Sequence, residues 1–267
     1  IDGWYYINGI EFEILEGGTV KFTWIVDEAF SYLAGSLSPI MIDIPKITGS
    51  EGINFGYVPE IVNLTKRTIT FWAYFDARSY ANIIAAGNAT TIGFMIHMDD
   101  TGRLRYSHGM STTSGQWKTT EIVIITGQWN LYVVTHDTTT PTDAPVIFGD
   151  GGSALALTLI DTPSGTIPDE TGVEFVISSP PVPDVKIRDV RVYNRILSEA
   201  EGVTLFNNFT PDFSVVTDSG LVFQAPVVLT KDITYYTDRT LTSDDRVLDN
   251  IHGRVGTPVS SPIARIP

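Results

Sequence analysis

The chain of 267 residues contains no cysteine. Without thiols it cannot form disulfide bonds, thiolate zinc sites or iron–sulfur clusters, and it has no cysteine nucleophile. Basic side chains are also scarce, because 17 Lys and Arg stand against 31 Asp and Glu and leave a formal net charge of −14. Binding to a phosphate backbone needs clustered Lys and Arg, so we expect no nucleic-acid partner.

Long apolar runs and the common catalytic motifs are absent as well. The longest nearly apolar stretches, such as residues 69–75, are far shorter than the ~20 residues of a membrane-spanning helix, so no membrane partner is expected. No phosphate-binding loop, dinucleotide fingerprint or Gly-x-Ser-x-Gly elbow occurs. The histidines lack the spacing of a zinc protease helix, and we expect ordinary surface side chains at His97, His108, His136 and His252.

The sequence is rich in short β-type runs separated by turn residues. Asn8-Gly9 within residues 5–15 predicts a hairpin, and residues 19–26 would extend it to a three-stranded meander. Residues 31–52, rich in Ser, Pro and Gly, are expected to form a connection. Residues 67–75 are apolar on both faces, which is typical of a central strand covered on both sides.

Further runs follow at short spacing, up to residue 194. Residues 91–98 and 103–107 predict a hairpin around Gly102. Ser198 and Glu201 form a capping box that predicts a short helix. Many short strands without alternating helices predict an all-β protein, an antiparallel β-sandwich with one short helix.

Four stretches, in order, resemble the laminin-G-like and concanavalin A-like lectin and glucanase family. They are residues 52–76, 93–107, 126–152 and 185–207, and the last is the most specific, because a strand leads into Asn-Arg-x-Leu-Ser-x-x-Glu. The resemblance implies a jelly-roll, concanavalin A-like sandwich. It divides the chain into an N-terminal meander and connection (1–50), a sandwich core (51–210) and a C-terminal extension (211–267).

The C-terminal extension departs from the family pattern. Residues 220–259 are similar to the stretch that normally begins such a domain, yet they lie at the end of this chain. They could complete the same sandwich, open a second copy of it, or pair with a neighbouring subunit. The sequence leaves these alternatives open.

A carboxylate motif provides the sharpest lead to catalysis. Glu11, Glu13 and Glu16 resemble the Glu-x-Asp-x-x-Glu strand of family 16 glycoside hydrolases, in which two nearby carboxyl groups hydrolyse the glycosidic bond. Here the middle residue is Glu, and the segment lies outside the family core. A solvated strand face explains it better, so we expect no enzyme and no catalytic residues.

Candidate ligand-binding residues come from aromatic and acidic side chains in loops. Trp117, in a polar segment, is the preferred exposed platform for stacking on sugar, followed by Tyr106 and the pair Tyr235 and Tyr236. Trp24, Trp72 and Trp129 lie in expected strands and are assigned to the core. Asp150, in a Gly-containing turn, is added as a ligand-binding candidate.

Calcium is the ion that the resemblance implies, and no other cofactor is expected. Hard oxygen ligands suit Ca²⁺, and several aspartates lie in Gly-containing loops. Turn hydrogen bonding to neighbouring amides is the alternative role for each of them. These aspartates are Asp99, Asp100, Asp150, Asp161 and Asp169.

The function expected from these observations is a non-catalytic, surface-exposed structural or adhesion module. It would belong to a virus or phage particle, bind glycan, and contact surface glycans or neighbouring subunits of a larger assembly. The alternative is a secreted carbohydrate-active protein, either a glycoside hydrolase of this fold or its binding module. The expected location is extracellular or on the virion surface.

Overall fold

The computed structural model describes residues 52–179, 185–207 and 219–225, and it adds the strands at 6–14, 20–27, 41–44, 238–240, 247–248, 255–259 and 263–265. The chain divides into two compact units, Ile1–Ser38 and Pro39–Pro267. In the first unit, β1 (Tyr6–Ile14) pairs antiparallel with β2 (Val20–Asp27).

The predicted turn at Asn8-Gly9 is wrong. β1 runs continuously through both residues, and its register with β2 shifts between Ile7 and Gly9. A bulge inserts an extra residue into one strand and, like a turn, it favours residues that tolerate irregular backbone. Asn8-Gly9 therefore marks a bulge and not a turn. The described part of this unit is a two-stranded hairpin instead of the expected three-stranded meander.

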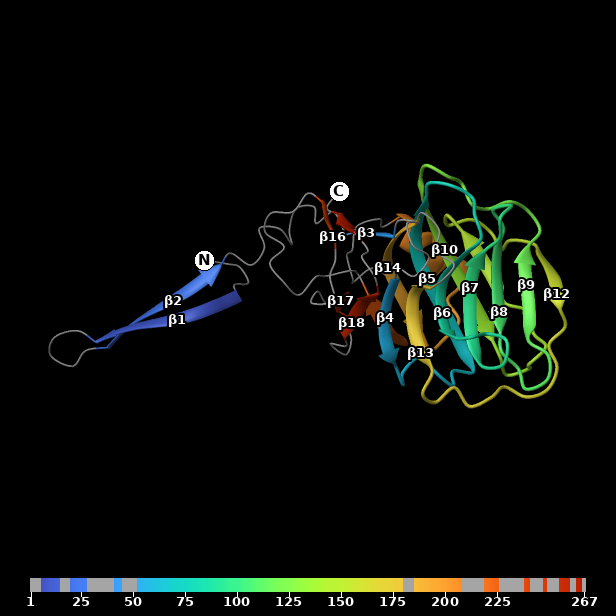
Figure 1. The fold of residues 1–267 in the computed structure, drawn as a ribbon, viewed down its shortest axis with the longest axis horizontal. Helices are drawn as coiled ribbons and strands as arrows, with labels where there is room; N and C mark the ends of the chain where they lie inside the picture. Colours follow the sequence, from blue (N-terminus) through green and yellow to red (C-terminus); the bar gives the residue numbers. More distant parts are fainter. Residues whose placement is uncertain are drawn as a thin grey trace. The chain divides into compact units, whose positions relative to one another are not determined.

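Two antiparallel sheets make up the described strands of the second unit, as Figure 1 shows. One has nine strands in the order β12, β9, β8, β7, β6, β13, β4, β18, β17. Its strands are β4 (Gly52–Tyr57), β6 (Ala81–Gly87), β7 (Gly93–Met98), β8 (Leu104–His108), β9 (Gly115–Thr119), β12 (Leu157–Asp161), β13 (Glu174–Ser179), β17 (Val247–Leu248) and β18 (Val255–Val259).

The second sheet has eight strands in the order β11, β10, β5, β14, β3, β19, β16, with β15 paired to β14 beside this path. Its strands are β3 (Met41–Ile44), β5 (Lys66–Phe75), β10 (Trp129–Asp137), β11 (Val146–Gly149), β14 (Val185–Tyr193), β15 (Leu221–Ala225), β16 (Asp238–Thr240) and β19 (Ile263–Arg265). β5 lies between β10 and β14, which confirms the prediction of a central strand.

The main apolar core lies between the two sheets. Ile69, Phe71 and Phe75 on β5 are fully buried and belong to the same cluster as Ile96 on β7 and Phe175 on β13. Alternation along each strand directs every second side chain into this core. The architecture confirms the expected antiparallel, concanavalin A-like β-sandwich.

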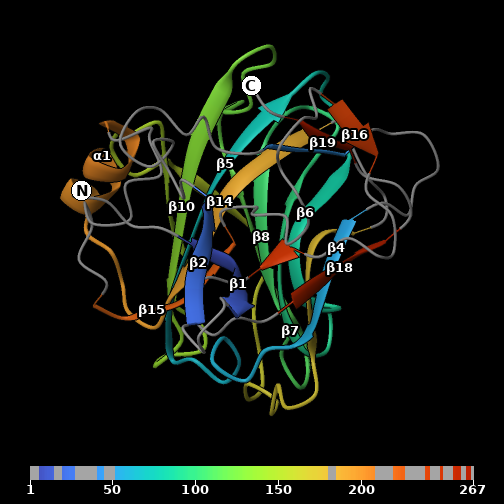
Figure 2. The same ribbon diagram turned by 90° about the vertical axis from the view of Figure 1, so that its left-hand side faces the viewer.

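The segment expected to be only a connection contains a strand. β3 pairs with β14 and β19 in the eight-stranded sheet. The described strands of the C-terminal extension pair within this chain's own sandwich, since β15 joins β14 and β18 joins β4. Figure 2 shows β18 beside β4.

The helix α1 (Glu199–Asn207) follows β14 and begins as the capping box predicts. Ser198 Oγ accepts a hydrogen bond from the Glu201 amide at 3.3 Å, and the Ser198 amide donates to Glu201 Oε2 at 2.8 Å. The ring of Phe206 stacks on Trp72 with centroids 5.8 Å apart, so α1 packs on the eight-stranded sheet away from the main core. Within the described residues, no helix is long and apolar enough to cross a membrane.

Candidate functional site

Trp117 and Tyr106, the preferred sugar platforms, are not exposed. Trp117 is 3% exposed and Tyr106 is fully buried, and both side chains belong to the core between the sheets. They face each other across β8 and β9 in register, with ring centroids 6.4 Å apart. The expectation of a polar loop around Trp117 is wrong because its flanking polar residues alternate with it along a strand. Tyr235 and Tyr236 lie outside the described residues.

Asp150 is half-buried and holds a turn between strands. Its Oδ1 accepts a hydrogen bond from the Leu131 amide at 2.8 Å, and its own amide donates to the Leu131 carbonyl at 2.9 Å. Burial raises the pKa of Asp150 above its ordinary value, although the Leu131 bond opposes this. The described contacts of Asp150 therefore belong to the turn, and a ligand-binding role for it stays a prediction.

Two of the loop aspartates, Asp99 and Asp169, accept hydrogen bonds from neighbouring groups, which is the alternative role expected for them. Asp99 Oδ1 accepts hydrogen bonds from the amides of Thr101 and Arg103, and Asp169 Oδ1 accepts from Thr171 and Asn63. Burial acts to raise the pKa of Asp99, but these bonds and Arg105 hold it below its ordinary value. In the part of the chain that the structure describes, no three acidic or histidine side chains converge on a point where a metal ion could bind.

The histidines with described positions are buried, contrary to the expectation of surface side chains. His97, His108 and His136 are 5%, 2% and 3% exposed. Burial lowers the pKa of His97 and His136 to about 4 and that of His108 to about 2, so all three are neutral at pH 7. His252 lies outside the described residues.

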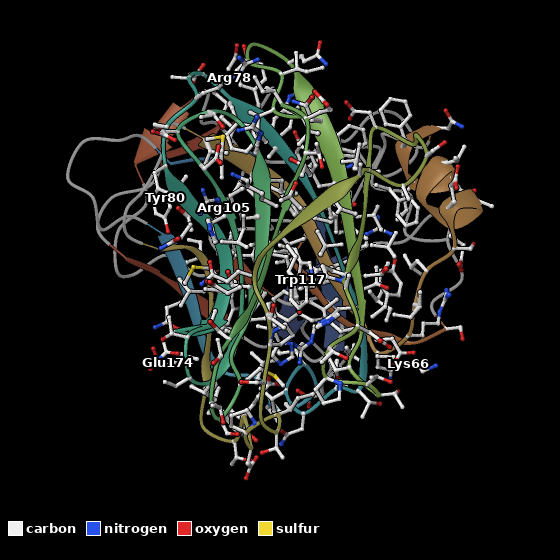
Figure 3. All side chains as sticks on the ribbon, turned by 90° about the vertical axis from the view of Figure 1, so that its right-hand side faces the viewer. Lys66, Arg78, Tyr80, Arg105, Trp117 and Glu174 are labelled. Carbon is white, nitrogen blue, oxygen red and sulfur yellow. The ribbon has the colours of Figure 1, made fainter. Side chains whose placement is uncertain are left out.

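The outer face of the nine-stranded sheet carries a polar row across its middle strands. Register places His97 on β7 opposite Arg105 on β8, and Arg105 opposite Lys118 on β9. Tyr80 stands next to this row, 44% exposed, with its ring centroid 5.5 Å from that of His97. We call these residues, with Gln116, the outer-face patch. Figure 3 shows Tyr80 and Arg105 on one side of the sheet, with Trp117 nearer the middle of the sandwich.

The outer-face patch contains two basic side chains, Arg105 and Lys118, in an otherwise acidic protein. Arg105 Nη2 lies 3.3 Å from Asp99 Oδ2, and 27% of the Arg105 side chain is exposed. Lys118 is partly exposed and forms no ion pair among the described residues. An exposed aromatic ring in a patch that also contains Arg and Lys is a chemistry suited to a sugar that carries acidic groups.

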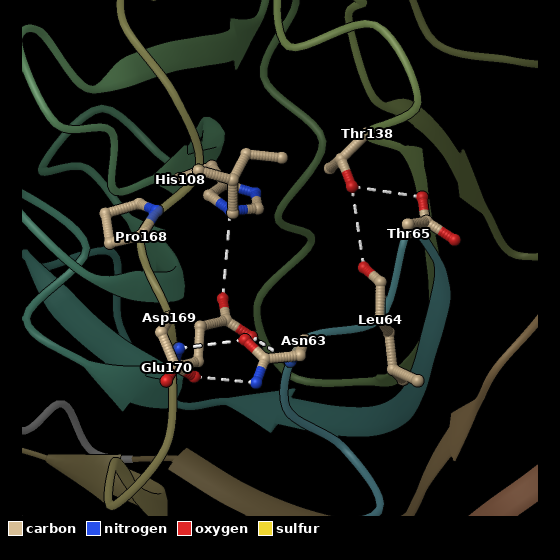
Figure 4. A pocket seen from close by; sticks show the side chains of 9 residues that line it. Asn63, Leu64, Thr65, His108, Thr138, Pro168, Asp169 and Glu170 are labelled. Atoms are coloured by element: carbon tan, nitrogen blue, oxygen red, sulfur yellow. Dashed lines mark hydrogen bonds and ion pairs between the residues drawn. The ribbon is translucent and has the colours of Figure 1, made fainter.

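A separate cavity of about 350 Å³ opens at one end of the sandwich, and we call it the end pocket. Figure 4 shows it between the segment after β4, the end of β8, the start of the loop after β10 and the loop before β13. Its lining residues are Asn63, Leu64, Thr65, His108, Thr138, Ile167, Pro168, Asp169 and Glu170. Asn63 joins two of these segments, because its amide donates to Glu170 Oε2 at 2.7 Å and its Oδ1 accepts from the Glu170 amide at 2.8 Å.

A buried polar cluster adjoins the end pocket. Arg67 on β5 pairs with Glu170 at 2.9 Å. His108 Nε2 lies 3.8 Å from Glu170 Oε1, and His108 Nδ1 lies 3.3 Å from His136 Nδ1. The Tyr106 hydroxyl completes the cluster, 3.0 Å from His136 Nδ1.

Sequence reasoning missed both sites for identifiable reasons. On β8, Leu104, Tyr106 and His108 point inward, whereas Arg105 and Ser107 point outward, so the period-2 pattern already separated the patch from the core. Attention to aromatic residues selected Trp117 and Tyr106, which lie on the inward faces of β9 and β8. No local signal links Arg67 with Glu170, which are 103 residues apart.

These features define a lectin-type β-sandwich. A model of the concanavalin A-like lectin/glucanases superfamily matches residues 49–201, more than half of the chain, and the chain belongs to this family. The resemblance seen in the sequence is thereby confirmed. A comparison with curated protein sequences gives no significant match.

A comparison with solved structures gives matches at low sequence identity. A putative carbohydrate binding protein from Bacteroides ovatus ATCC 8483 superposes with a TM-score of 0.55 at 15% identity, covering 93% of this chain and 64% of that chain. The native heptameric SAP-like pentraxin from Limulus polyphemus gives a TM-score of 0.48 at 12% identity, covering 70% of this chain and 92% of that chain.

Proposed function

We propose that the chain is a non-catalytic glycan-binding module and that the outer-face patch is its sugar site. The observation that carries the proposal is the exposed Tyr80 ring beside the polar row of His97, Arg105 and Lys118. An aromatic face stacks on the apolar face of a sugar ring, and the charge-assisted donors of Arg and Lys bind hydroxyl or carboxylate oxygens. Membership of a family of lectins and glucanases supports this assignment.

The module is proposed to bind its glycan without hydrolysing it. Glu11 and Glu13 lie on β1 in the first unit, whereas the patch belongs to the second, and Glu16 lies outside the described residues. Asp99, a carboxylate that contacts Arg105 of the patch, also accepts hydrogen bonds from two backbone amides. A retaining glycosidase needs a second carboxyl about 5–5.5 Å from the first, with one of them able to donate a proton.

Glycan binding by the full chain, with two matched tyrosine variants, tests this proposal. Tyr80→Ala is expected to weaken binding about fivefold, since an aromatic stack contributes on the order of 1 kcal/mol. Tyr57→Ala, at a tyrosine that is 40% exposed on β4, is the control and should bind normally. If Tyr80→Ala bound a glycan as tightly as the wild type does, the sugar site would lie elsewhere. Release of reducing sugar by the wild type, abolished in Glu11→Gln, would overturn the non-catalytic assignment.

We further propose a surface role, as an adhesion or structural module of a virus or phage particle, with a secreted carbohydrate-active protein as the alternative. The net charge of −14 and the absence of cysteine support either setting. The edge strand β12 exposes Leu159 and Ile160 at 48% and 40%, which suits contact with a neighbouring subunit. Mass spectrometry of purified particles and of cell-free medium from the source distinguishes the two, and detection in neither would overturn both.

A further inference from the structure

A row of aromatic and charged side chains crosses the outer face of the eight-stranded sheet. Register places Trp129 on β10 opposite Tyr74 on β5, and Tyr74 opposite Lys186 on β14. These three strands lie side by side, as Figure 2 shows. The residues on either side of Tyr74 along β5 belong to the core between the sheets, so alternation directs Tyr74 outward. We call Trp129, Tyr74 and Lys186, together with Asp76 directly after β5, the aromatic row.

The side chains of the aromatic row contact one another. The rings of Tyr74 and Trp129 meet edge to face, with centroids 5.9 Å apart. Lys186 Nζ lies 4.2 Å from the centroid of the Tyr74 ring and 3.1 Å from Asp76 Oδ2. A cation–π contact and an ion pair therefore hold one ammonium group and one carboxylate beside an aromatic pair.

The aromatic row stays accessible where its neighbours on the same face are covered. α1 packs on Trp72, which is 5% exposed, whereas Tyr74 and Trp129 are partly exposed. The Asp76 side chain is 48% exposed. β11 pairs with β10 over Tyr132–Thr135, and Trp129 lies three residues before that stretch. Aromatic surface that remains exposed beside hydrogen-bonding groups is typical of a ligand site.

The charges of the aromatic row favour an uncharged ligand. The Lys186 ammonium is already matched by Asp76, and register places another acidic residue, Asp43 of β3, opposite Lys186. The row therefore carries no excess positive charge to attract an acidic sugar. A sugar hydroxyl both donates and accepts hydrogen bonds, so neighbouring hydroxyls of a neutral sugar match a carboxylate next to an ammonium.

We infer that the aromatic row is a second sugar site, on the opposite face of the sandwich from the outer-face patch, and that it takes an uncharged sugar chain. One sugar ring would stack on Trp129, since one face of Tyr74 already holds the Lys186 ammonium. A hydroxyl would donate to Asp76 while its neighbour accepts from Lys186.

The size of the aromatic row agrees with this ligand. Trp129 and Lys186 lie two strand spacings apart, which is about 9–10 Å between their backbones and suits two linked sugar rings. Sites on opposite faces would let one module hold two glycan chains at once. Such bivalency strengthens attachment to a glycan-coated surface without any further contact.

Saturation-transfer NMR of the full chain with three neutral tetrasaccharides tests the inference. The probes are cellotetraose, mannotetraose and chitotetraose. We expect saturable binding of at least one of them, with the strongest transfer to the C–H protons of one sugar ring face. Absence of binding by all three would overturn the inference.

Variants locate the bound tetrasaccharide. Asp76→Ala changes an exposed side chain and should weaken binding about tenfold, because a hydrogen bond to a charged group is lost. The matched control is Asp137→Ala, which breaks a pair with Lys66 of the same 3.1 Å separation at the other end of β5 and should leave binding unchanged. Trp129→Leu keeps an apolar side chain against the cluster around Trp72 and should weaken binding about fivefold.

The outcomes separate this site from the outer-face patch. Tyr80→Ala should bind the neutral probe as the wild type does. Loss of binding in Tyr80→Ala would place the probe on the outer-face patch and overturn the second site, while the glycan-binding function stands. Equal weakening by Asp76→Ala and Asp137→Ala, or unchanged binding in Trp129→Leu, would also overturn the inference and leave the Tyr80 test of the patch untouched.

Discussion

Arg67 and Glu170 form an ion pair inside the sandwich, with Nη2 2.9 Å from Oε2 and with 2% and 1% of their side chains exposed. The Arg67 guanidinium also lies 4.2 Å from the centroid of the Phe94 ring, which adds a cation–π contact. A charge at this depth persists only when it is paired, because desolvation costs several kcal/mol for each ion. The pair joins β5 to the loop that forms the end pocket.

Removal of one member of this pair should be strongly destabilising. Glu170→Gln leaves the Arg67 charge buried without its counter-charge, and the expected loss in the free energy of unfolding is about 3–5 kcal/mol. Urea denaturation measures it. The control is Lys66→Met, which breaks the neighbouring exposed pair with Asp137, where the side chains are 52% and 35% exposed, and should leave the free energy of unfolding nearly unchanged. Similar losses for both variants would contradict the buried role of Glu170.

The buried histidines should make stability depend on pH. Burial lowers the pKa of His136 to about 4, and its value in the unfolded chain is about 6.5. Below pH ~6.5 the unfolded state therefore takes up a proton that the folded state excludes, and the free energy of unfolding falls as pH decreases toward 4. Above pH ~6.5 this histidine has no effect.

Comparison of urea denaturation between pH 6.5 and 5 checks this dependence. Each buried neutral histidine contributes a slope of about 1.4 kcal/mol per pH unit where only the unfolded chain is protonated. His136→Gln should reduce the slope by one such contribution, while His108 and His97 retain theirs. An unchanged slope in the variant would show that His136 does not titrate on unfolding.

Replacement of Trp117 should affect stability before it affects sugar binding. Trp117 is 3% exposed in the core, so Trp117→Ala is expected to cost about 3–5 kcal/mol. Trp117→Phe retains a ring and should cost less. Tyr80→Ala, at an exposed ring, should leave the urea midpoint nearly unchanged and weaken glycan binding. If Trp117→Phe abolished glycan binding while keeping wild-type stability, the original assignment of Trp117 as a sugar platform would be restored.

The capping box at α1 offers a local test of the fold. Ser198→Ala removes the acceptor of the Glu201 amide, and the expected loss is about 1 kcal/mol of stability. Ser198→Thr keeps a hydroxyl and should lose only a small part of that. Thermal unfolding monitored by circular dichroism measures both variants. An equal loss for Thr and Ala would show that the hydroxyl does not cap the helix.

Local sequence patterns predicted the secondary structure correctly where a pattern is typical of a single kind of element. The apolar run of residues 67–75 became β5, and Ser198 with Glu201 begins α1. Asn8-Gly9 failed because the same backbone freedom serves a turn or a bulge, and only pairing with β2 distinguishes them. The location of the C-terminal strands was also undecidable from sequence, since β18 pairs with β4 about 200 residues away along the chain.

By itself, the sequence determined an all-β sandwich without thiol chemistry, because strand periodicity, turn residues and a missing residue type are local properties. Tertiary structure alone decided that Trp117 and Tyr106 face the core, while Tyr80 and Arg105 face outward. It likewise brought Arg67 and His108 to Glu170. The physical reason is that exposure and pairing depend on which distant segments cover a side chain, and a one-residue change along a strand reverses its face.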